Sequence, residues 1–426
     1  MTHYGLICPL ATGHLNTMLP LGKELQQRGH RVTLIGYPDG AAVAEKAGLE
    51  FCMIGENIFP VGSAKANLDK LGKLSGQAAI KYTMSLFADK ANTNLQYIPP
   101  AIKKIGIEAL IIDQAIIEGE TIAEVCNLPF ISICSAVVFN RELTIPPFFL
   151  NWSYNPSWWA KIRNKLGYEL LDSLVKPINL PINNYRAENN LLSRKLSKPY
   201  LPLAQISQEP AELEFPRQQL PAYFHFTGPY HSPVGREVPD FPWDKLTGQP
   251  LIYASMGTLQ NQLLFVFENI AKACEDLDAQ LVISLGGSAD PEILKGVPGN
   301  PIIVRYAPQL QLLQKANLTI THGGLNTTLE CLTNGVPMVA IPVANDQPGV
   351  AARIVWSGCG EAIPVKKVNV NNLRVAIKKV LTEDIYKQNA LRLQAAIKKA
   401  GGTKRAVDII EQAISTGKPV LNHINS

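Results

Sequence analysis

Short apolar segments alternate with longer stretches of helical periodicity along the whole chain, and this alternation restricts the fold more than any other feature of the sequence. The short segments are rich in Val, Ile and Leu, as strands of a parallel sheet covered by helices are. The strand candidates of the first half are Tyr4–Cys8, Arg31–Ile35, Glu50–Ile54, Ala109–Asp113, Phe130–Cys134 and Phe224–Thr227. Those of the second half are Leu251–Ser255, Gln280–Leu285, Ile302–Tyr306, Leu318–Thr321, Met338–Ile341 and Glu361–Val365. The pattern predicts an α/β fold with two Rossmann-like, doubly wound parallel sheets.

The length of the chain, 426 residues, exceeds one ordinary hydrophobic core and suits two domains of roughly 200 residues each. Four prolines among polar residues mark residues 228–248 as the connection between the domains. We therefore expect a first domain over 1–228, a linker over 229–248 and a second domain over 249–404, with a cleft between the domains. The last segment, 405–426, begins with a helical pattern that could pack back onto the first domain.

Composition excludes several classes of protein. Apolar residues make up 46% of the chain and charged residues 18%, as in soluble globular proteins. No apolar run reaches the roughly 20 residues that span a bilayer, and the N-terminus lacks the pattern of a secretory signal. The seven cysteines, an odd number, are expected to be free thiols, which favours a cytoplasmic protein. The net charge of +5 is small and no basic block is interleaved with aromatic residues, so nucleic acid is not an expected partner.

A histidine and an aspartate each follow a strand candidate of the first domain. His14 lies in the loop before a helix expected to begin near Thr17, and Asp113 ends the strand Ala109–Asp113. Ligands of doubly wound sheets bind beyond the carboxyl ends of the strands, so the two side chains can meet there. A carboxylate on one imidazole nitrogen raises the basicity of the other, which can then take a proton from a hydroxyl. From the spacing alone, a helix-capping loop histidine and a salt-bridged aspartate explain the pair equally well.

The strongest local motif lies in the second domain. It reads Tyr-Ala-Pro-Gln at 306–309, Thr-His-Gly-Gly-Leu-Asn-Thr-Thr-Leu-Glu at 321–330, Gly-Val-Pro at 335–337 and Asn-Asp-Gln-Pro at 345–348. The two glycines let a helix start close to a ligand, and the free N–H groups and partial positive charge of its N-terminus suit a diphosphate. An ordinary strand-to-helix turn would explain the glycines alone, but not their combination with His322, Glu330 and the Asp346-Gln347 pair.

With these residues, the chain resembles the UDP-dependent glycosyltransferases of the two-domain GT-B fold, over essentially its whole length. Stretches outside the donor motif resemble the bacterial branch of the family that glucosylates carotenoids, among them Asn-Arg-Glu at 140–142, Leu-Ala-Gln-Ile-Ser-Gln at 203–208 and Ser-Met-Gly-Thr-Leu-Gln at 255–260. The resemblance implies that the first domain binds a lipophilic small-molecule acceptor and the second the nucleotide sugar. UDP-glucose would be the donor co-substrate, with no bound cofactor and no metal.

The resemblance also gives roles to single residues of the second domain. Those around uracil and ribose would be Tyr306, Ala307, Gln309 and, on the ribose hydroxyls, Glu330. The diphosphate would be held by His322, Gly324, Asn326 and Thr327, with hydroxyl contacts from Ser255 and Thr258, and the sugar by Asp346 and Gln347. The plant form of the motif has Trp at the positions of Tyr306 and Leu325, so sugar selectivity does not transfer from plant enzymes to this chain.

The implied reaction is a single displacement with inversion, in which His14 removes the proton of the acceptor hydroxyl as UDP departs. The helix N-terminus and His322 would stabilise charge on the β-phosphate, which is the role of a metal ion in other glycosyltransferases. The acidic pattern Asp276-Leu277-Asp278 follows a helix at the opposite end of the sheet from the ligand, so we interpret it as a solvated turn and expect no metal site.

Aromatic residues in the first domain bear on the acceptor; they are Phe148, Phe149, Trp152, Tyr154, Trp158 and Trp159. A pocket for a long apolar molecule would explain this density, and a helical core with a few surface rings explains it equally well. The resemblance implies that the molecule is a carotenoid such as zeaxanthin. Lys161, Arg163 and Lys165 lie next to these rings, so the segment could also make a peripheral contact with a membrane surface.

Other functions stay open at this point. A glucosyltransferase that acts on a polyketide, a flavonoid or a sterol would have the same second domain. A nucleotide-sugar epimerase shares the fold, but that reaction gives no role to a base that activates an external hydroxyl. A non-catalytic binding protein could retain the fold without needing His14, Asp113 and the donor residues together.

Overall fold

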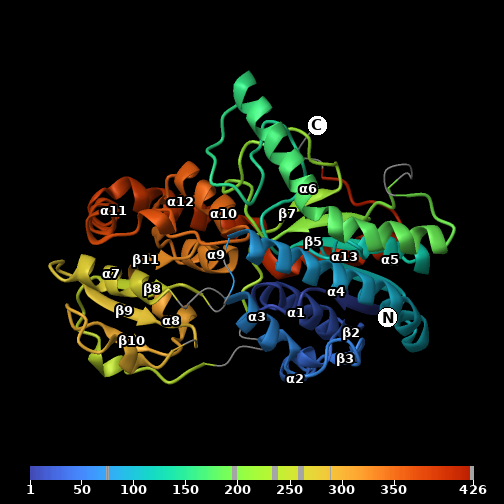
Figure 1. The fold of residues 1–426 in the computed structure, drawn as a ribbon, viewed down its shortest axis with the longest axis horizontal. Helices are drawn as coiled ribbons and strands as arrows, with labels where there is room; N and C mark the ends of the chain where they lie inside the picture. The colour runs from blue at the N-terminus through green and yellow to red at the C-terminus, as the bar shows by residue number, and fades with distance from the viewer. Residues whose placement is uncertain are drawn as a thin grey trace.

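The computed structural model describes residues 1–72, 74, 76–193, 199–232, 238–257, 263–287 and 289–422. Within these residues the chain forms two lobes, each built on a parallel sheet with helices packed against it (Figure 1). The first sheet consists of β1 (His3–Ile7), β2 (Arg31–Gly36), β3 (Glu50–Met53), β4 (Ala109–Asp113), β5 (Phe130–Cys134), β6 (Ala204–Ser207) and β7 (Phe224–Phe226). The second consists of β8 (Leu251–Ser255), β9 (Gln280–Ser284), β10 (Ile302–Val304), β11 (Ala316–Thr321), β12 (Met338–Ala340) and β13 (Gly360–Ala362).

The helices fall into the same two groups. Those between the strands of the first lobe are α1 (Thr12–Gln27), α2 (Ala41–Ala47), α3 (Ser63–Gly72), α4 (Gly76–Ile105), α5 (Gly119–Cys126) and α6 (Trp158–Glu188). Those that follow are α7 (Leu264–Cys274), α8 (Gln309–Leu313), α9 (Leu325–Thr333), α10 (Gln347–Trp356), α11 (Val370–Thr382), α12 (Asp384–Ala400) and α13 (Gly402–Thr416). None of the helices in the described part of the chain has the length and apolar character needed to cross a membrane.

Both sheets reverse their strand order once, and the reversal fixes where ligands bind. The strand orders are β3-β2-β1-β4-β5-β6-β7 and β10-β9-β8-β11-β12-β13. Successive strands are therefore added toward one edge up to β3 and β10 and toward the other edge from β4 and β11 onward, so the order reverses between β1 and β4 and between β8 and β11. Each pair is parallel, with Ile7 beside Ile112 in the first sheet and Ser255 beside Thr321 in the second. A crevice at the carboxyl ends of these strands is the usual ligand site of such a sheet.

The predicted fold class is confirmed, with differences at single strands. β6 was not among the strand candidates, because Ala-Gln-Ile-Ser is short and half polar. β13 ends at Ala362, three residues earlier than predicted, because Pro364 lacks the N–H that would continue the ladder and Val365 begins a 3₁₀ turn. The predicted linker over 229–248 includes residues 233–237, which lie outside the described residues.

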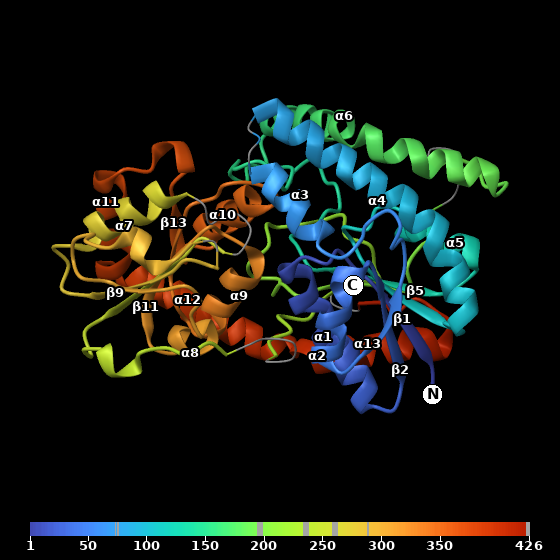
Figure 2. The same ribbon diagram turned by 60° about the horizontal axis from the view of Figure 1, so that its bottom comes forward.

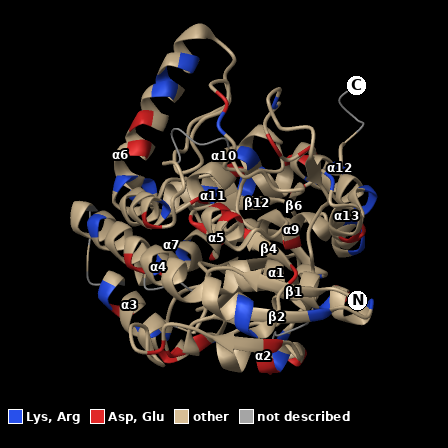
Figure 3. Cartoon of the chain, turned by 90° about the vertical axis from the view of Figure 1, so that its right-hand side faces the viewer, with Lys and Arg blue, Asp and Glu red and all other residues tan. Residues whose placement is uncertain are grey.

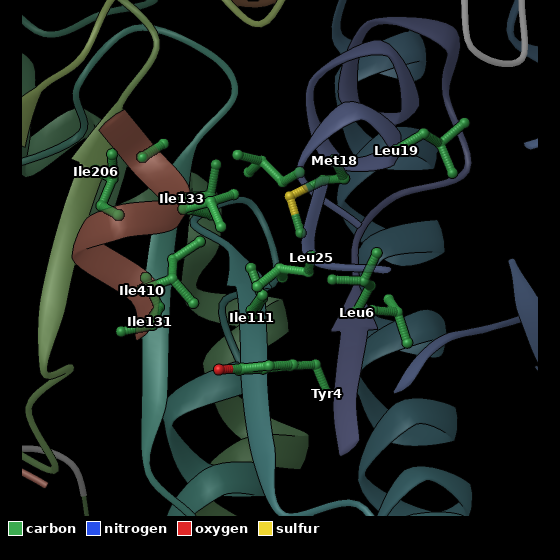
Figure 4. Close-up of a cluster of buried hydrophobic side chains, with 14 of the residues drawn as sticks. Tyr4, Leu6, Met18, Leu19, Leu25, Ile111, Ile131, Ile133, Ile206 and Ile410 are labelled. Carbon is green, nitrogen blue, oxygen red and sulfur yellow. The ribbon is translucent and has the colours of Figure 1, made fainter. Parts of the chain in front are cut away.

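The C-terminal helix α13 belongs to the core of the first lobe. Figure 4 shows Ile410 of this helix beside Ile131 and Ile133 of β5, and Figure 2 shows α13, in red, running beneath the first sheet. The buried residues of α13 recur at helical spacing and share one cluster with β1, β4 and α1; they are Ala406, Val407, Ile409, Ile410 and Ala413. Because the chain starts in the first lobe and returns to it, both ends hold that lobe together.

Candidate active site

The two residues predicted to act on the acceptor lie together at the reversal point of the first sheet. Asp113 is the last residue of β4, and His14 follows β1. One detail of the prediction is wrong: α1 begins at Thr12, so His14 lies in the first helical turn and not in a loop.

His14, Asp113 and Ser135 form a hydrogen-bonded group. Nδ1 of His14 lies 2.8 Å from Oδ2 of Asp113, and the Ser135 hydroxyl donates to the same oxygen at 2.5 Å while lying 2.8 Å from Nδ1. The backbone N–H of Ala115 donates to Oδ1 at 2.9 Å. The Asp113 side chain is fully buried, whereas 24% of the His14 side chain is exposed. A carboxylate facing Nδ1 favours the tautomer with its proton there, which leaves Nε2 as the free base.

The electrostatics of His14 favour a base. Burial lowers the pKa of the imidazole, but the charge of Asp113, its hydrogen bond and the charge of Asp346 together outweigh burial and raise the pKa above the ordinary value. Asp346 belongs to the second lobe, so both lobes act on this imidazole. Ser135 was not predicted from the sequence, although its place directly after β5 puts it at the same edge of the sheet.

His322 lies at the matching point of the second sheet, between β11 and α9. Its ring fills the space between two glycines: a Cβ added to Gly257 would lie 2.6 Å from Cε1 and one added to Gly324 would lie 2.5 Å from Nε2. Burial lowers the pKa of His322 to about 4, with a smaller opposite effect of the Ser255 backbone. The imidazole is therefore neutral near neutral pH, and it can donate one hydrogen bond to a ligand.

The N-terminus of α9 is open to an anion. The residue before its first turn is Gly324, which offers no side chain to cap the helix N–H groups. Gly323 has φ +78°, a conformation that favours glycine, and a Cβ there would make a tight contact of 3.3 Å with the Gln347 carbonyl oxygen. The backbone groups and the positive end of the helix thus face the same edge as His322.

Asn326, predicted to contact the diphosphate, connects the two lobes. Its Nδ2 donates to the carbonyl of Gly13 at 2.6 Å, and its Oδ1 accepts from Nε2 of Gln208 at 2.9 Å. Gln208 also donates to the carbonyl of Ser135 at 2.7 Å. One side chain of the second lobe is therefore bonded to the backbone next to His14 and, through Gln208, to the residue beside Asp113.

The residues predicted around the nucleoside also meet one another. Nε2 of Gln309 donates to Oε2 of Glu330 at 2.5 Å and lies 3.4 Å from the Thr327 hydroxyl, while Oε1 of Gln309 accepts from Tyr253 at 3.1 Å. These bonds hold the α8 N-terminus against α9.

The loop before α8 contains the other two residues predicted to lie around the nucleoside. Tyr306 is half exposed, and its hydroxyl packs closely over Gly287. A Cβ added to Gly287 would lie only 1.9 Å from the Tyr306 hydroxyl oxygen. Gly287 has φ +85°, so glycine is required on both counts. Ala307 packs against the core of the second lobe.

The pair predicted to bind the sugar begins α10. Asp346 precedes this helix, and burial raises its pKa, with His14 and the Val137 backbone acting in the opposite direction. Oε1 of Gln347 accepts from the backbone N–H groups of Val343 at 2.9 Å and Ala344 at 3.0 Å, which orders the loop before the helix. The charges of Asp346 and His14 act on each other across the junction of the lobes.

The first loop of the second lobe is described in part. Ser255 ends β8 and accepts from the backbone N–H of Gly257 at 3.3 Å. Thr258, the other hydroxyl predicted here, lies outside the described residues. Elsewhere in the described residues, no group of three or more His, Cys, Asp and Glu side chains is arranged to hold a metal ion. Asp276 pairs with Arg374 at 3.3 Å, and Asp278 accepts from Gln249 at 3.0 Å, as residues of a surface turn do.

A buried ionic cluster at the lobe junction was missed in the sequence. Glu214 of the first lobe contacts Arg353 of α10 at 2.7 Å and Arg217 at 3.3 Å, and all three side chains are almost fully buried. Glu209 lies close by, and burial together with the charge of Glu214 raises its pKa to about 8. Its carboxyl oxygens have no hydrogen-bond partner in the described part of the chain. No local pattern could reveal this cluster, because its members come from two distant segments.

The aromatic segment before α6 lies between α6 and α10. The Phe148 backbone is so close to Gly349 of α10 that a Cβ there would lie 2.2 Å from its carbonyl oxygen. Tyr154 packs edge-on against Trp356 of α10, with ring centroids 5.0 Å apart. Trp158 and Trp159, by contrast, are exposed. Part of the predicted aromatic group is therefore packing at the lobe junction, and part is surface.

The arrangement of two such lobes defines the class of protein. Solved glycosyltransferases share it: the glycosyltransferase of kitacinnamycin matches with a TM-score of 0.76 and 24% identity over 96% of this chain and 98% of that chain. CalG4, the calicheamicin glycosyltransferase, matches with a TM-score of 0.76 and 20% identity over 98% of this chain and 100% of that chain. The fold is the GT-B fold of glycosyltransferases, as the sequence predicted.

The family follows from the sequence comparison. The family model described as "UDP-glucoronosyl and UDP-glucosyl transferase" matches residues 108–404, and the chain belongs to this family of transferases. Zeaxanthin glucosyltransferase of Pantoea ananas is 33% identical over 99% of this chain and 98% of its own length. Zeaxanthin glucosyltransferase of Pseudescherichia vulneris is 30% identical over 99% of this chain and 100% of its own length. The protein is therefore an enzyme that transfers a glycosyl group from a nucleotide sugar to a small-molecule acceptor.

Proposed function

We propose that the enzyme transfers glucose from UDP-glucose to a hydroxyl group of a carotenoid such as zeaxanthin, with inversion at the anomeric carbon and without a metal ion. The observation that supports the mechanism is the hydrogen-bonded group of His14, Asp113 and Ser135, in which the charge of Asp346 from the second lobe also raises the pKa of His14. The acceptor is proposed from the two full-length relatives, both of which are named zeaxanthin glucosyltransferases.

In the proposed reaction, Nε2 of His14 takes the proton of the acceptor hydroxyl as its oxygen attacks the anomeric carbon. The new bond to the acceptor oxygen forms while the bond between that carbon and the β-phosphate oxygen breaks, so the configuration inverts. Asp113, hydrogen-bonded to Nδ1, stabilises the imidazolium that results. The proton stays on His14 until it passes to solvent, and UDP leaves with the electron pair of the broken bond.

Stabilisation of the departing UDP is proposed to come from the second lobe. The uncapped N-terminus of α9 and the neutral imidazole of His322 supply hydrogen-bond donors aimed at the place where negative charge grows. Donors fixed in advance need no rearrangement during the reaction. Asp346, at the start of α10, would accept hydrogen bonds from sugar hydroxyls and so hold the anomeric carbon in front of His14.

The test is a product assay with purified enzyme, UDP-glucose and detergent-solubilised zeaxanthin, with and without a chelator. We expect a glucoside by mass spectrometry, a β-configured anomeric proton by NMR, and equal rates with the chelator. An α-glucoside would contradict inversion, and loss of activity with the chelator would contradict metal independence. If UDP-glucose binds but no carotenoid glucoside forms, the acceptor is wrong, and polyketides, flavonoids and sterols are tested next. Conversion of UDP-glucose to another UDP-sugar without acceptor would instead indicate an epimerase.

A further inference from the structure

The first half of α6 carries a row of exposed apolar side chains. Trp159, Ile162, Leu166 and Leu170 recur every three or four residues and so lie along one face of the helix, with Trp158 at its start. All five are between 48% and 74% exposed. The second half of the same helix is different, because Ile178 and Ile182 are buried in the core of the first lobe. The row of five is named the α6 stripe below.

Positive charge accompanies the α6 stripe. The residues Trp158–Tyr168 include Lys161, Arg163 and Lys165 and no carboxylate. Lys161 and Lys165 are exposed, and the Arg163 guanidinium lies over the rings of Trp152 and Trp159, 4.7 and 5.5 Å from their centroids. Figure 3 shows basic residues on the part of α6 that projects from the lobe, with acidic residues further along the helix. The nearest are Glu169 and Asp172, and Asp172 is paired with Arg141 at 2.5 Å.

The inner face of the same half-helix is fixed to the acceptor side of the enzyme. Nδ2 of Asn164 donates to the Leu143 carbonyl at 2.9 Å, and the Tyr168 hydroxyl donates to the Ile145 carbonyl at 3.0 Å. Those two carbonyls belong to the segment whose Phe148 backbone contacts Gly349 of α10, three residues after Asp346. The α6 stripe is therefore the outer surface of the wall that borders the site.

We propose that the α6 stripe rests on the surface of a lipid bilayer with anionic headgroups. The apolar side chains would enter the boundary between headgroups and acyl chains, the two tryptophans would lie at headgroup level, and Lys161 and Lys165 would contact lipid phosphates. A helix of this kind lies in the plane of the surface and does not span it. The proposal extends the proposed function, because an acceptor dissolved in the bilayer would then enter the site from the membrane side.

Vesicle flotation tests this contact without substrate, so it does not depend on the proposed function. The full-length protein is mixed with vesicles of phosphatidylcholine alone, or of equal parts phosphatidylcholine and phosphatidylglycerol. We expect flotation with the mixed vesicles, weaker flotation at high salt, and about a tenfold or greater loss of vesicle affinity in Ile162→Ser/Leu166→Ser. The matched control is Ile385→Ser on α12, because Ile162 and Ile385 are equally exposed at 53%.

Three outcomes would overturn the proposal: no flotation of the wild type, equal flotation of wild type and the double variant, or equal loss in the double variant and the Ile385 control. A wild-type dimer that the double variant dissociates, without flotation of either, would also overturn it and assign the stripe to a second copy of the chain. UDP binding by each variant, measured by calorimetry, shows that it is folded. A failed carotenoid assay combined with flotation would refute the proposed acceptor and leave the membrane contact standing.

Discussion

The two lobes place a histidine at the same point of the same fold, and the two histidines have opposite electrostatics. His14 and His322 each lie beside the strand pair where the sheet reverses its order, next to the start of a helix. The pKa of His14 is raised although burial lowers it, because the charge of Asp113, its hydrogen bond and the charge of Asp346 together outweigh burial. The pKa of His322 is lowered to about 4 by burial, and the ring packs against Gly257 and Gly324, which carry no charge that could offset burial.

The difference shows how one scaffold is used for two tasks. An imidazole hydrogen-bonded to a carboxylate is a stronger base and can hold a proton during a reaction, whereas a buried neutral imidazole can only donate or accept a hydrogen bond. The surroundings of each ring, not the ring or the fold, decide between these tasks. The comparison supports the proposed proton transfer in the first lobe and the proposed binding of the diphosphate in the second.

The largest effect is expected for His14→Ala. Loss of the base should lower kcat by about 10³–10⁴. UDP-glucose affinity should stay within about twofold of the wild type, because the donor residues lie in the other lobe. Single-turnover kinetics and calorimetry with UDP measure the two quantities. Unchanged turnover in a variant that still binds UDP would remove the catalytic role of His14.

A smaller effect, of a different kind, is expected for His322→Ala. Loss of one hydrogen-bond donor to the diphosphate should weaken UDP binding and lower kcat/KM for UDP-glucose by about 10²-fold. His322→Gln retains a donor and should recover part of the loss. The comparison of the two lobes fails if UDP affinity is the same in all three proteins.

A smaller decrease in activity than for His322→Ala is expected for Ser135→Ala. Its hydroxyl donates to the same Asp113 oxygen that lies next to Nδ1 of His14, so we expect it to position the pair. We expect about a 3–10-fold lower kcat, with KM for both substrates unchanged, and recovery in Ser135→Thr. A change in KM with kcat unchanged would contradict a positioning role.

The smallest effect is expected for Glu209→Gln and concerns stability. The pKa of Glu209 is raised to about 8, well above the ordinary 4.5, so over this interval unfolding releases a proton that the folded state retains. Stability should therefore fall as pH rises from about 4.5 to about 8, and the neutral Gln removes this dependence. Thermal unfolding at about pH 8 should show a gain on the order of 1 kcal/mol, which shrinks towards pH 5. The control is Glu212→Gln, because Glu212 is a nearby exposed carboxylate; an equal gain there would refute the argument.

Most of the fold could be predicted because strands buried on both faces leave a strong signal. Segments such as Ala109–Asp113 and Leu251–Ser255 are short and apolar, and they were placed correctly. β6 was missed because its four residues, half of them polar, carry almost no such signal. The start of α1 was also missed: the helix was expected from near Thr17, but it begins at Thr12, and burial of Leu15, Met18 and Leu19 stabilises it.

The site divides in the same way. The proximity of His14 and Asp113 could be predicted because each ends or follows a strand in the sequence. The carboxyl ends of parallel strands lie at one edge of the sheet, so the two residues lie there together. Ser135, Glu209 and the bond between Asn326 and Gly13 depend on contacts between distant segments, which no short pattern encodes. The donor residues were predicted through the family motif, and this prediction did not include the hydrogen bonds among them, such as that of Gln309 to Glu330.

The pH dependence of kcat/KM in the wild type and in Asp113→Asn tests the central claim most directly. His14 must be neutral to accept a proton, so the rate should fall as pH decreases through its pKa. Asp113 raises that pKa, and its replacement should move the acidic limb to lower pH by about 1–2 units while lowering the plateau by about 10²–10³. An acidic limb at the same pH in both proteins would contradict the account, because the titrating base would then not be the histidine that Asp113 holds.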